Sequence, residues 1–322
     1  MKPGRVLIGL AAASVVLLAL ALAVGSVPLS LPEVLSALAG QGDPLQQSLV
    51  WELRLPRAAS AFIIGAQLAL AGALMQVLLR NPLADPYILG VSGGAGVAAL
   101  CAMLLGLAGL LLTASAFVGA LLSTLLVFGL AHSRIDWTPT RLLLTGVVVA
   151  MGWGALISFI LAIAPEAQLR GMLFWLMGDL SYSQFPALGT VILLLTSALI
   201  WPQARDLNVL ARGEWQAAAL GVEIQRLRWR LYFIAALLTA SAVVQAGSIG
   251  FIGLVVPHLL RLLGCHDHRY LLPAAVLCGG SLLLLGDTLA RSMIAPQQLP
   301  VGIITAFIGV PLFLYLLNRR VQ

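Results

Sequence analysis

The stretch from residue 248 to residue 269 reads SIGFIGLVVPHLLRLLGCHDHR, an apolar run that ends in polar and mostly basic residues. Gly250, Gly253 and Pro257 interrupt this run, and they predict a helix that is broken at membrane depth. A broken helix leaves backbone N–H and C=O groups unpaired, and lipid cannot satisfy them. We therefore expect protein or a water-filled path to surround the segment, as in transporters.

The composition is that of a chain whose solvent is mostly lipid. Hydrophobic residues make up 61% of the 322 positions, charged residues make up 9%, and the mean hydropathy is +1.02. These values predict an all-α integral membrane protein. Because no long polar block separates the apolar segments, we expect a single transmembrane domain over residues 1–322 and no soluble module.

Ten apolar segments predict ten membrane-spanning helices, one of them short or broken. Nine of these segments cover residues 6–24, 58–79, 87–107, 110–131, 142–164, 187–201, 231–246, 271–290 and 301–317, and the short one covers 251–263.

Basic residues predict the orientation, because cytoplasmic loops carry an excess of Lys and Arg. With the short segment crossing, both termini are cytoplasmic, and of the 18 basic residues only Arg54, Arg57, Arg170 and Arg291 lie outside. Without that crossing the last third of the chain inverts, and the difference in the number of basic residues between the two sides of the membrane becomes smaller. The formal charge of +6 then mainly reflects the basic residues that set the orientation, and its side effect is attraction to anionic lipid. It gives no reason to expect a nucleic-acid partner.

The longest predicted cytoplasmic loop, residues 202–230, contains a short amphipathic pattern. Leu207, Leu210, Trp215 and Ala218 recur near helical spacing, and Gly221 follows as a helix stop. One interpretation is a helix that lies on the membrane surface. The other is a ridge that fits a groove on a cytoplasmic partner.

The chain lacks the motif with which it could drive transport by itself. A phosphate-binding Walker loop requires G-x-x-x-x-G-K-[ST], and Lys2 is the only lysine. ATP-driven movement of a solute would therefore need a second chain as the motor. We expect no enzymatic activity in this chain, since it contains neither paired catalytic carboxylates nor an HExxH pattern.

Seven long motifs follow one another along the chain in the order typical of a known family. They are RLPR at 54–57, GAQLALAGALMQ at 65–76, NPLADPYILGVSGGAG at 81–96, GSIGFIGLVVPHLLR at 247–261, DHRYLLP at 267–273, GDTLAR at 286–291 and LPVGIITAFIGVP at 299–311. With these motifs the chain resembles, nearly end to end, the FecCD-type permeases. These are the membrane subunits of ABC importers for iron-siderophores, haem and vitamin B12.

The resemblance implies the type II importer permease fold in the inner membrane of a bacterium. It implies a homodimer with its path along the dimer axis, two cytoplasmic ATPase subunits and a periplasmic substrate-binding protein. The cargo implied is a bulky metal chelate, an iron-siderophore or haem, with vitamin B12 (cobalamin) as the alternative. An ion-coupled secondary transporter is the alternative of a different class, but it would need ionisable residues deep in the spans, and only Asp287 comes near.

The resemblance also implies roles for particular residues. Arg54, Arg57 and Arg291 match arginines that receive glutamates of the binding protein, and the predicted orientation independently places all three outside. The alternative is that they snorkel at helix ends, or that Arg291 pairs with Asp287 on one helix face.

On the cytoplasmic side, residues 206–225 match the coupling helices that contact the ATPase. Two loops match the cytoplasmic gate, one after the second span and one before the fifth. The coupling candidates are Leu207, Leu210, Glu214, Ala218 and Gly221, and the gate candidates are Asn81, Leu83, Thr138 and Thr140.

No cofactor or metal site is expected. His258, His266 and His268 fall within eleven residues, but the pattern around them is typical of the family, and we expect hydrogen bonds to loop backbone. The glycines at 92–96 lie in an apolar span with no following Lys, so we expect close helix packing rather than a phosphate site. Gln67, Met75 and Gln76 are candidates for lining the path.

Overall fold

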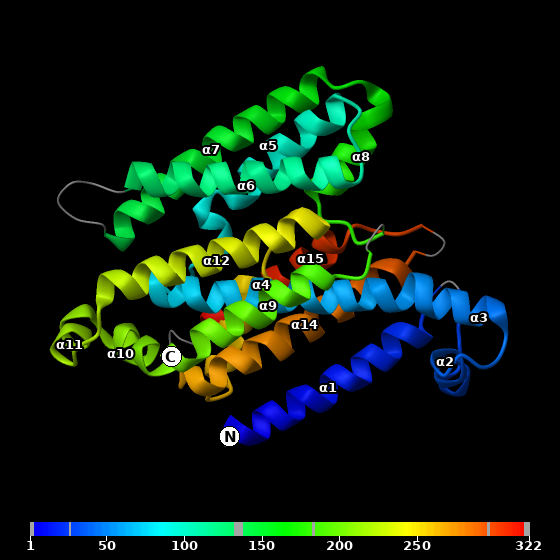
Figure 1. Cartoon of the computed structure of the whole chain (residues 1–322), viewed down its shortest axis with the longest axis horizontal. Helices are drawn as coiled ribbons and strands as arrows, with labels where there is room; N and C mark the ends of the chain where they lie inside the picture. Colours follow the sequence, from blue (N-terminus) through cyan, green and yellow to red (C-terminus); the bar gives the residue numbers. More distant parts are fainter. Residues whose placement is uncertain (1–2, 26, 132–137, 182–183, 295–296, 319–322) are drawn as a thin grey trace.

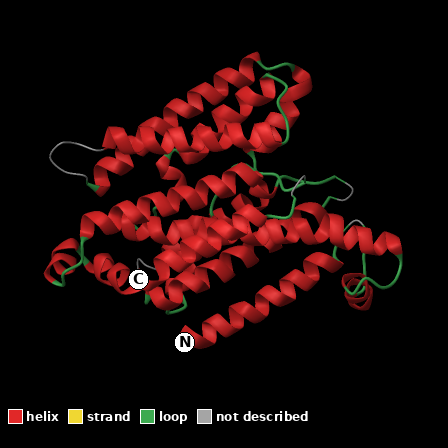
Figure 2. Ribbon diagram, in the orientation of Figure 1, coloured by secondary structure: helices red, strands yellow, loops and turns green. Residues whose placement is uncertain are grey.

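The computed structural model describes residues 3–25, 27–131, 138–181, 184–294 and 297–318, and these residues form helices and connecting loops only (Figure 2). Seven helical stretches are long and apolar enough to cross a membrane, and three further apolar helices are shorter. The all-α prediction is therefore confirmed. Each of the ten predicted apolar segments overlaps one of the apolar helices. Lys2 lies outside the described residues.

The helices carry the labels of Figure 1. Five of the long apolar stretches are single helices: α1 (Pro3–Ala23), α6 (Leu110–Ala131), α7 (Pro139–Ile163), α12 (Ile224–Ala246) and α14 (His268–Ser292). The other two are continuous with neighbouring turns, namely Pro44–Leu78, which ends in α4 (Leu55–Leu78), and Ala187–Arg212, which begins with α9 (Ala187–Ile200). The shorter apolar helices are α5 (Val91–Leu104), α13 (Ile252–Leu262) and α15 (Val301–Asn318). The connections hold α2 (Leu31–Leu38), α3 (Pro44–Ser48), α8 (Glu166–Leu176), α10 (Ala204–Arg212) and α11 (Glu214–Ala219), the π-helical turn η1 (Leu49–Arg54), and the 3₁₀ turns η2 (Pro86–Leu89) and η3 (Trp201–Gln203).

Helix α4 is the centre of the bundle, and its main neighbours are α14, α12 and α13. Most of its residues are buried, because Ala and Gly dominate its sequence and let neighbouring backbones approach closely. At Gly72 a Cβ would collide with the Gly253 carbonyl of α13, and at Gly65 it would collide with the Gly279 carbonyl of α14. These contacts fix α4 against two helices that follow it by almost two hundred residues in the chain.

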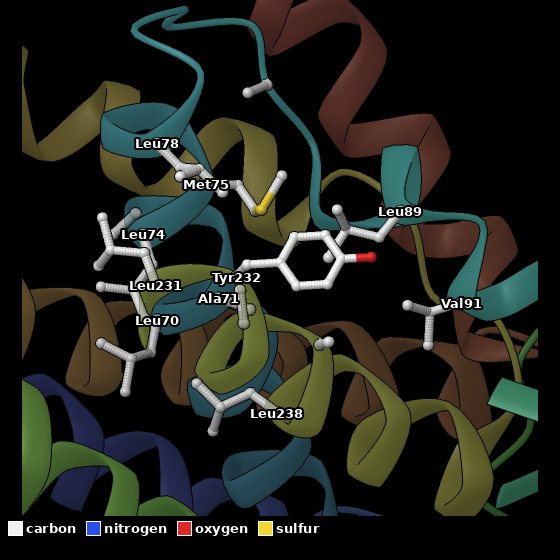
Figure 3. Packing of buried hydrophobic residues seen from close by; sticks show 14 of the residues in the cluster. Leu70, Ala71, Leu74, Met75, Leu78, Leu89, Val91, Leu231, Tyr232 and Leu238 are labelled. Atoms are coloured by element: carbon white, nitrogen blue, oxygen red, sulfur yellow. The ribbon is translucent and has the colours of Figure 1, made fainter. Parts of the chain in front are cut away.

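The core between α4 and α12 surrounds Tyr232, which has no exposed surface (Figure 3). Leu70, Leu74 and Met75 of α4 pack there with Leu231 of α12. The Tyr232 hydroxyl donates a hydrogen bond of 2.7 Å to the Thr124 carbonyl on α6, so the one polar atom of the side chain is satisfied. Met75 is thus buried inside the subunit. Gln67 is also fully buried and donates to the Gly189 carbonyl, so the prediction that these two residues line a path is wrong.

The helix break lies between α12 and α13, at residues 247–251, so it includes Gly250 of the three predicted interruptions but not Gly253 or Pro257. Gly247 and Phe251 have φ values of +71° and +70°, in the left-handed region, whereas Gly253 and Pro257 lie inside α13. The Tyr87 hydroxyl donates to the Ile249 carbonyl (3.0 Å) and accepts from the Ile249 N–H (2.9 Å). Protein therefore satisfies the backbone of the break, as the sequence analysis expected.

The glycines at 92–96 pack against neighbouring helices, which confirms their structural interpretation. A Cβ at Gly94 would collide with Gly119 of α6, and one at Gly93 would collide with Trp153 of α7. Helices α5, α6, α7 and α8 form one group, and α10 and α11 lie at the opposite end of the long axis from α2 and α3 (Figure 1).

Candidate functional sites at the two ends of the helical bundle

Two of the three arginines predicted as a docking site, Arg57 and Arg291, contact Asp287. Arg57, in the first turn of α4, donates from Nε to both carboxylate oxygens at 3.0 Å and from Nη2 to Oδ1 at 2.8 Å. Arg291, one turn after Asp287 on α14, places its Nε 3.9 Å from the other oxygen. Arg57, Arg291 and Asp287 therefore join the start of α4 to the end of α14, and with Arg54 they form what we call the arginine cluster.

The same arginines hold the end of α1. Arg54 donates to the carbonyls of Leu22 and Ala23 at 2.6 and 3.0 Å, and Arg291 donates to the carbonyl of Ala21. The last carbonyls of a helix lack partners within the helix, so these bonds cap α1. All three arginine side chains are largely buried, with at most 11% of the surface exposed for Arg57. The cluster thus has a structural role in addition to any role in docking.

The predicted coupling segment forms two helices rather than one. Gly213 separates α10 from α11 with φ +144° and ψ +152°, a conformation that side chains other than glycine adopt only with strain. Gly221 follows α11 with φ +78°, as a helix stop should.

The apolar side chains of this segment divide between two environments. Leu207 and Leu210 are buried in the core of the bundle, so they cannot form an outward ridge. Ala218 and Gly221 are exposed, and so are Trp215 (91%) and Leu220 (70%). The surface available to a partner is therefore the outer face of α11, which includes Trp215, and the turn after it. The helical pattern had placed Trp215 on the same face as Leu210, but Trp215 is exposed and Leu210 is buried.

Glu214 makes two ion pairs and is not a solvated charge. Its Oε1 lies 2.6 Å from Nη2 of Arg80 and also contacts Nη2 of Arg228. Arg80 follows α4 and has φ +47°, whereas Arg228 lies in the first half of α12 with a side chain only 6% exposed. We call these three residues the Glu214 triad. The triad joins the coupling segment to the ends of two central helices, and sequence analysis missed both arginines because nothing local links them to Glu214.

The gate candidates occupy two turns at the end of the molecule that holds α10 and α11 (Figure 1). Asn81 directly follows Arg80, and its Oδ1 accepts a hydrogen bond of 2.9 Å from the Leu83 N–H, which fixes a tight turn. Leu83 is 44% exposed. Thr138 caps α7, since its Oγ1 accepts from the Arg141 N–H at 3.3 Å, and Thr140 is exposed in the first turn of that helix.

Asp85, two residues beyond Leu83, is a half-buried acid in the same turn region. Its Oδ1 accepts a hydrogen bond of 2.8 Å from the Tyr87 N–H. Burial raises the pKa of the Asp85 carboxyl to about 6, because the charged form loses its hydration, and the hydrogen bond offsets only part of this effect. The group therefore titrates in a range that a solvated aspartate does not reach.

Bacterial permeases are similar to this chain over most of its length. The vitamin B12 import system permease protein BtuC of Yersinia enterocolitica is 44% identical over 84% of this chain and 82% of its own. The BtuC protein of Vibrio cholerae is 43% identical over 86% and 84%, and that of Escherichia coli is 40% identical over 91% and 93%.

Solved structures agree with this relationship. A structure described as an inward-facing conformation of a metal-chelate type ABC transporter superposes with a TM-score of 0.88, at 35% identity, over 98% of this chain and 99% of that one. PsaBC of Streptococcus pneumoniae, at 17% identity and a TM-score of 0.58, shares the fold.

The helical bundle and these similarities define a multi-pass membrane permease of a bacterial ABC importer. Within that class, the model of the FecCD transport family matches residues 13–319. The chain belongs to the FecCD transport family.

Proposed function

We propose that this permease imports a bulky metal chelate across the bacterial inner membrane as a homodimer. Two ATPase subunits act on it from the cytoplasm, and a periplasmic binding protein delivers the cargo. ATP is hydrolysed on the ATPase subunits and not on this chain. The observation that carries this proposal is the Glu214 triad, because it ties a short exposed helix directly to the turn of the gate candidates.

The proposed topology has ten crossings in one transmembrane domain, with both termini in the cytoplasm. Helix α13 has 11 residues and rises about 16 Å, which is too short to cross ~30 Å of hydrocarbon alone. The loop at 247–251 precedes it at membrane depth, and Tyr87 satisfies that loop's backbone. Together with the excess of basic residues on one side, this supports a crossing formed by loop and short helix together.

The proposed coupling surface is the exposed face of α11. Trp215 and Leu220 would fit a groove of the ATPase, and closure of the two ATPase subunits would move α11 as a rigid body. Glu214 would transmit this movement through Arg80 to Asn81 and Leu83. A Trp215→Ser variant should lose the co-purifying ATPase, whereas Leu35→Ser, an exposed leucine on α2 at the other end, should retain it.

The proposed docking site is the arginine cluster, in which Arg57 and Arg291 contact the carboxylate of Asp287 and Arg54, like Arg291, bonds the end of α1. Acidic residues of the binding protein would be attracted to this net positive charge. The Asp287→Asn variant removes the internal counter-charge and should strengthen docking, while Arg57→Gln should weaken it. Changes of the same sign in both variants would show that packing, rather than charge, controls docking.

The cargo is assigned to metal chelates as a class. Vitamin B12 becomes the first candidate, because the three relatives named above carry the names of vitamin B12 permeases, and iron-siderophores and haem follow. The decisive experiment is reconstitution of the permease with its ATPase in vesicles, with separate additions of cobalamin, haem and a ferric siderophore in the presence of the binding protein. Accumulation of cargo by the permease without any ATPase would instead favour an ion-coupled secondary transporter.

A further inference from the structure

A cavity of roughly 540 Å³ lies between the end of α4, helix α10, the end of α13 and the start of α14. Its volume is in the range of small-molecule sites. It lies at the end of the molecule that also holds α11 and the gate candidates, but the coupling and gating roles proposed above use neither its volume nor most of its walls.

The walls of the cavity carry an excess of positive charge. Arg80, Arg212 and Arg261 contribute guanidinium groups, against the single carboxylate of Asp267. That carboxylate is already engaged, since it accepts hydrogen bonds from Asn208 Nδ2 at 2.7 Å and from the Arg269 N–H at 2.9 Å. Burial by itself would raise the pKa of Asp267, but these two bonds and the charge of Arg269 hold the pKa below its usual range, so the carboxylate stays ionised and bonded to its neighbours.

The arginines present their charge to the cavity in different ways. Arg212, the last residue of α10, is exposed, and no carboxylate of the described residues lies within ion-pair distance of it. Arg261 donates to the amide oxygen of Gln76. Arg80 shares Glu214 with Arg228.

A buried histidine also lines the cavity. His268 is 4% exposed and lines the cavity, and its Nδ1 lies 2.6 Å from the Asn208 Oδ1, which also accepts from the His268 backbone N–H. Because Oδ1 is an acceptor, Nδ1 carries the proton. The Nε2 atom of the same ring has no hydrogen-bond partner among the described residues, and a buried polar atom left in this state is costly.

From this geometry we propose that the cavity binds a phosphate group. Guanidinium forks match phosphate oxygens bidentately, and a phosphate offers enough oxygens for more than one fork. Two sources share this chemistry: the headgroup of an anionic phospholipid, which basic pockets at the cytoplasmic side of helical bundles bind, and a soluble phosphate compound. The assignment to the cytoplasmic side rests on the orientation under the proposed function.

The test uses the full chain purified in a neutral detergent, with inorganic pyrophosphate as the soluble probe and phosphatidylglycerol as the lipid probe. Titration calorimetry measures pyrophosphate binding, and native mass spectrometry measures retained lipid. The Arg212→Gln variant should weaken binding of one probe by about tenfold or more, as expected for a lost charge-assisted hydrogen bond. The matched control is Arg205→Gln, which removes an exposed arginine of the same helix that does not line the cavity, and it should bind as the unmodified chain does.

Each outcome decides the matter. Arg212-dependent binding of pyrophosphate supports a soluble phosphate ligand, and Arg212-dependent retention of phosphatidylglycerol without pyrophosphate binding supports a headgroup. Binding of neither probe overturns the proposal, and so does an equal loss in both variants, because it would indicate general charge attraction. Thermal unfolding of the variants without probe verifies that both are folded. Since no transport is measured, these results are independent of whether the proposed import activity is correct.

Discussion

Replacing Arg80 by Gln separates the mechanical role of the Glu214 triad from its structural role. The Arg80–Glu214 pair is half-exposed, with side-chain exposures of 41% and 30%, and pairs of this kind stabilise a fold by less than about 1 kcal/mol. The pair between Glu214 and the buried Arg228 stays in place. We therefore expect Arg80→Gln to lower the free energy of unfolding only slightly.

The effect on transport should be larger than the effect on stability. If the pair transmits movement from α11 to the gate turn, losing about 1 kcal/mol of coupling changes the population of the moved gate by about fivefold. The assay is cargo uptake and ATP hydrolysis measured together in vesicles that contain the permease and its ATPase. Uptake per ATP should fall about fivefold, while hydrolysis continues.

The matched control is Arg226→Gln, which breaks the exposed Arg226–Glu223 pair at the start of α12 without touching the gate turn. It should leave both uptake and hydrolysis unchanged. An unchanged ratio of uptake to hydrolysis in Arg80→Gln would refute the coupling argument, and so would an equal decline in the Arg226 control.

Three further predictions concern stability. Arg57→Gln should lower the free energy of unfolding by about 3 kcal/mol or more, because it leaves the buried Asp287 without its main partner, and the double variant with Asp287→Asn should regain part of this loss in thermal unfolding. Tyr87→Phe removes the hydroxyl that bonds both backbone groups of Ile249, so it should cost about 1–3 kcal/mol, and hydrogen exchange at residues 247–251 should become faster. The folded chain binds a proton at Asp85 more tightly than the unfolded chain does, so the free energy of unfolding should fall as pH rises from about 4 to about 6 and stay constant above pH 6. In Asp85→Asn, thermal unfolding should lack this pH dependence.

The sequence predicted the helices well, because long apolar runs leave few alternatives in lipid. It located the broken segment and correctly included Gly250 in the break, but it also assigned interruptions to Gly253 and Pro257, and the structure shows why these two were wrong. Gly247 and Phe251 adopt the left-handed conformation that ends one helix and starts the next, whereas Pro257 fits inside α13. Composition alone cannot distinguish a proline that breaks a helix from one that the packing tolerates.

The candidate sites were predictable in residue type but not in partnership. An amphipathic pattern shows that Leu207 and Leu210 are buried against something, and it does not tell whether this is a partner protein or the chain's own core. The structure shows the core. Likewise, Arg80 and Arg228 are ordinary basic residues in the sequence, and only folding brings them to Glu214.

Helix α4 connects the two candidate sites physically. Its first turn contains Arg57, which holds Asp287 of the arginine cluster, and Arg80 of the Glu214 triad follows its last turn. Its 24 residues rise about 36 Å, enough to pass through the hydrocarbon of a bilayer.

The close backbone contacts at Gly65 and Gly72 prevent α4 from sliding against α14 and α13 without a collision. A force applied at either end is therefore carried by the three helices as one body, which is the behaviour that rigid-body alternation of access requires. On this argument Gly72→Ala should disturb both ends together. If Gly72→Ala impaired ATPase coupling but left binding-protein docking intact, the two ends would move independently.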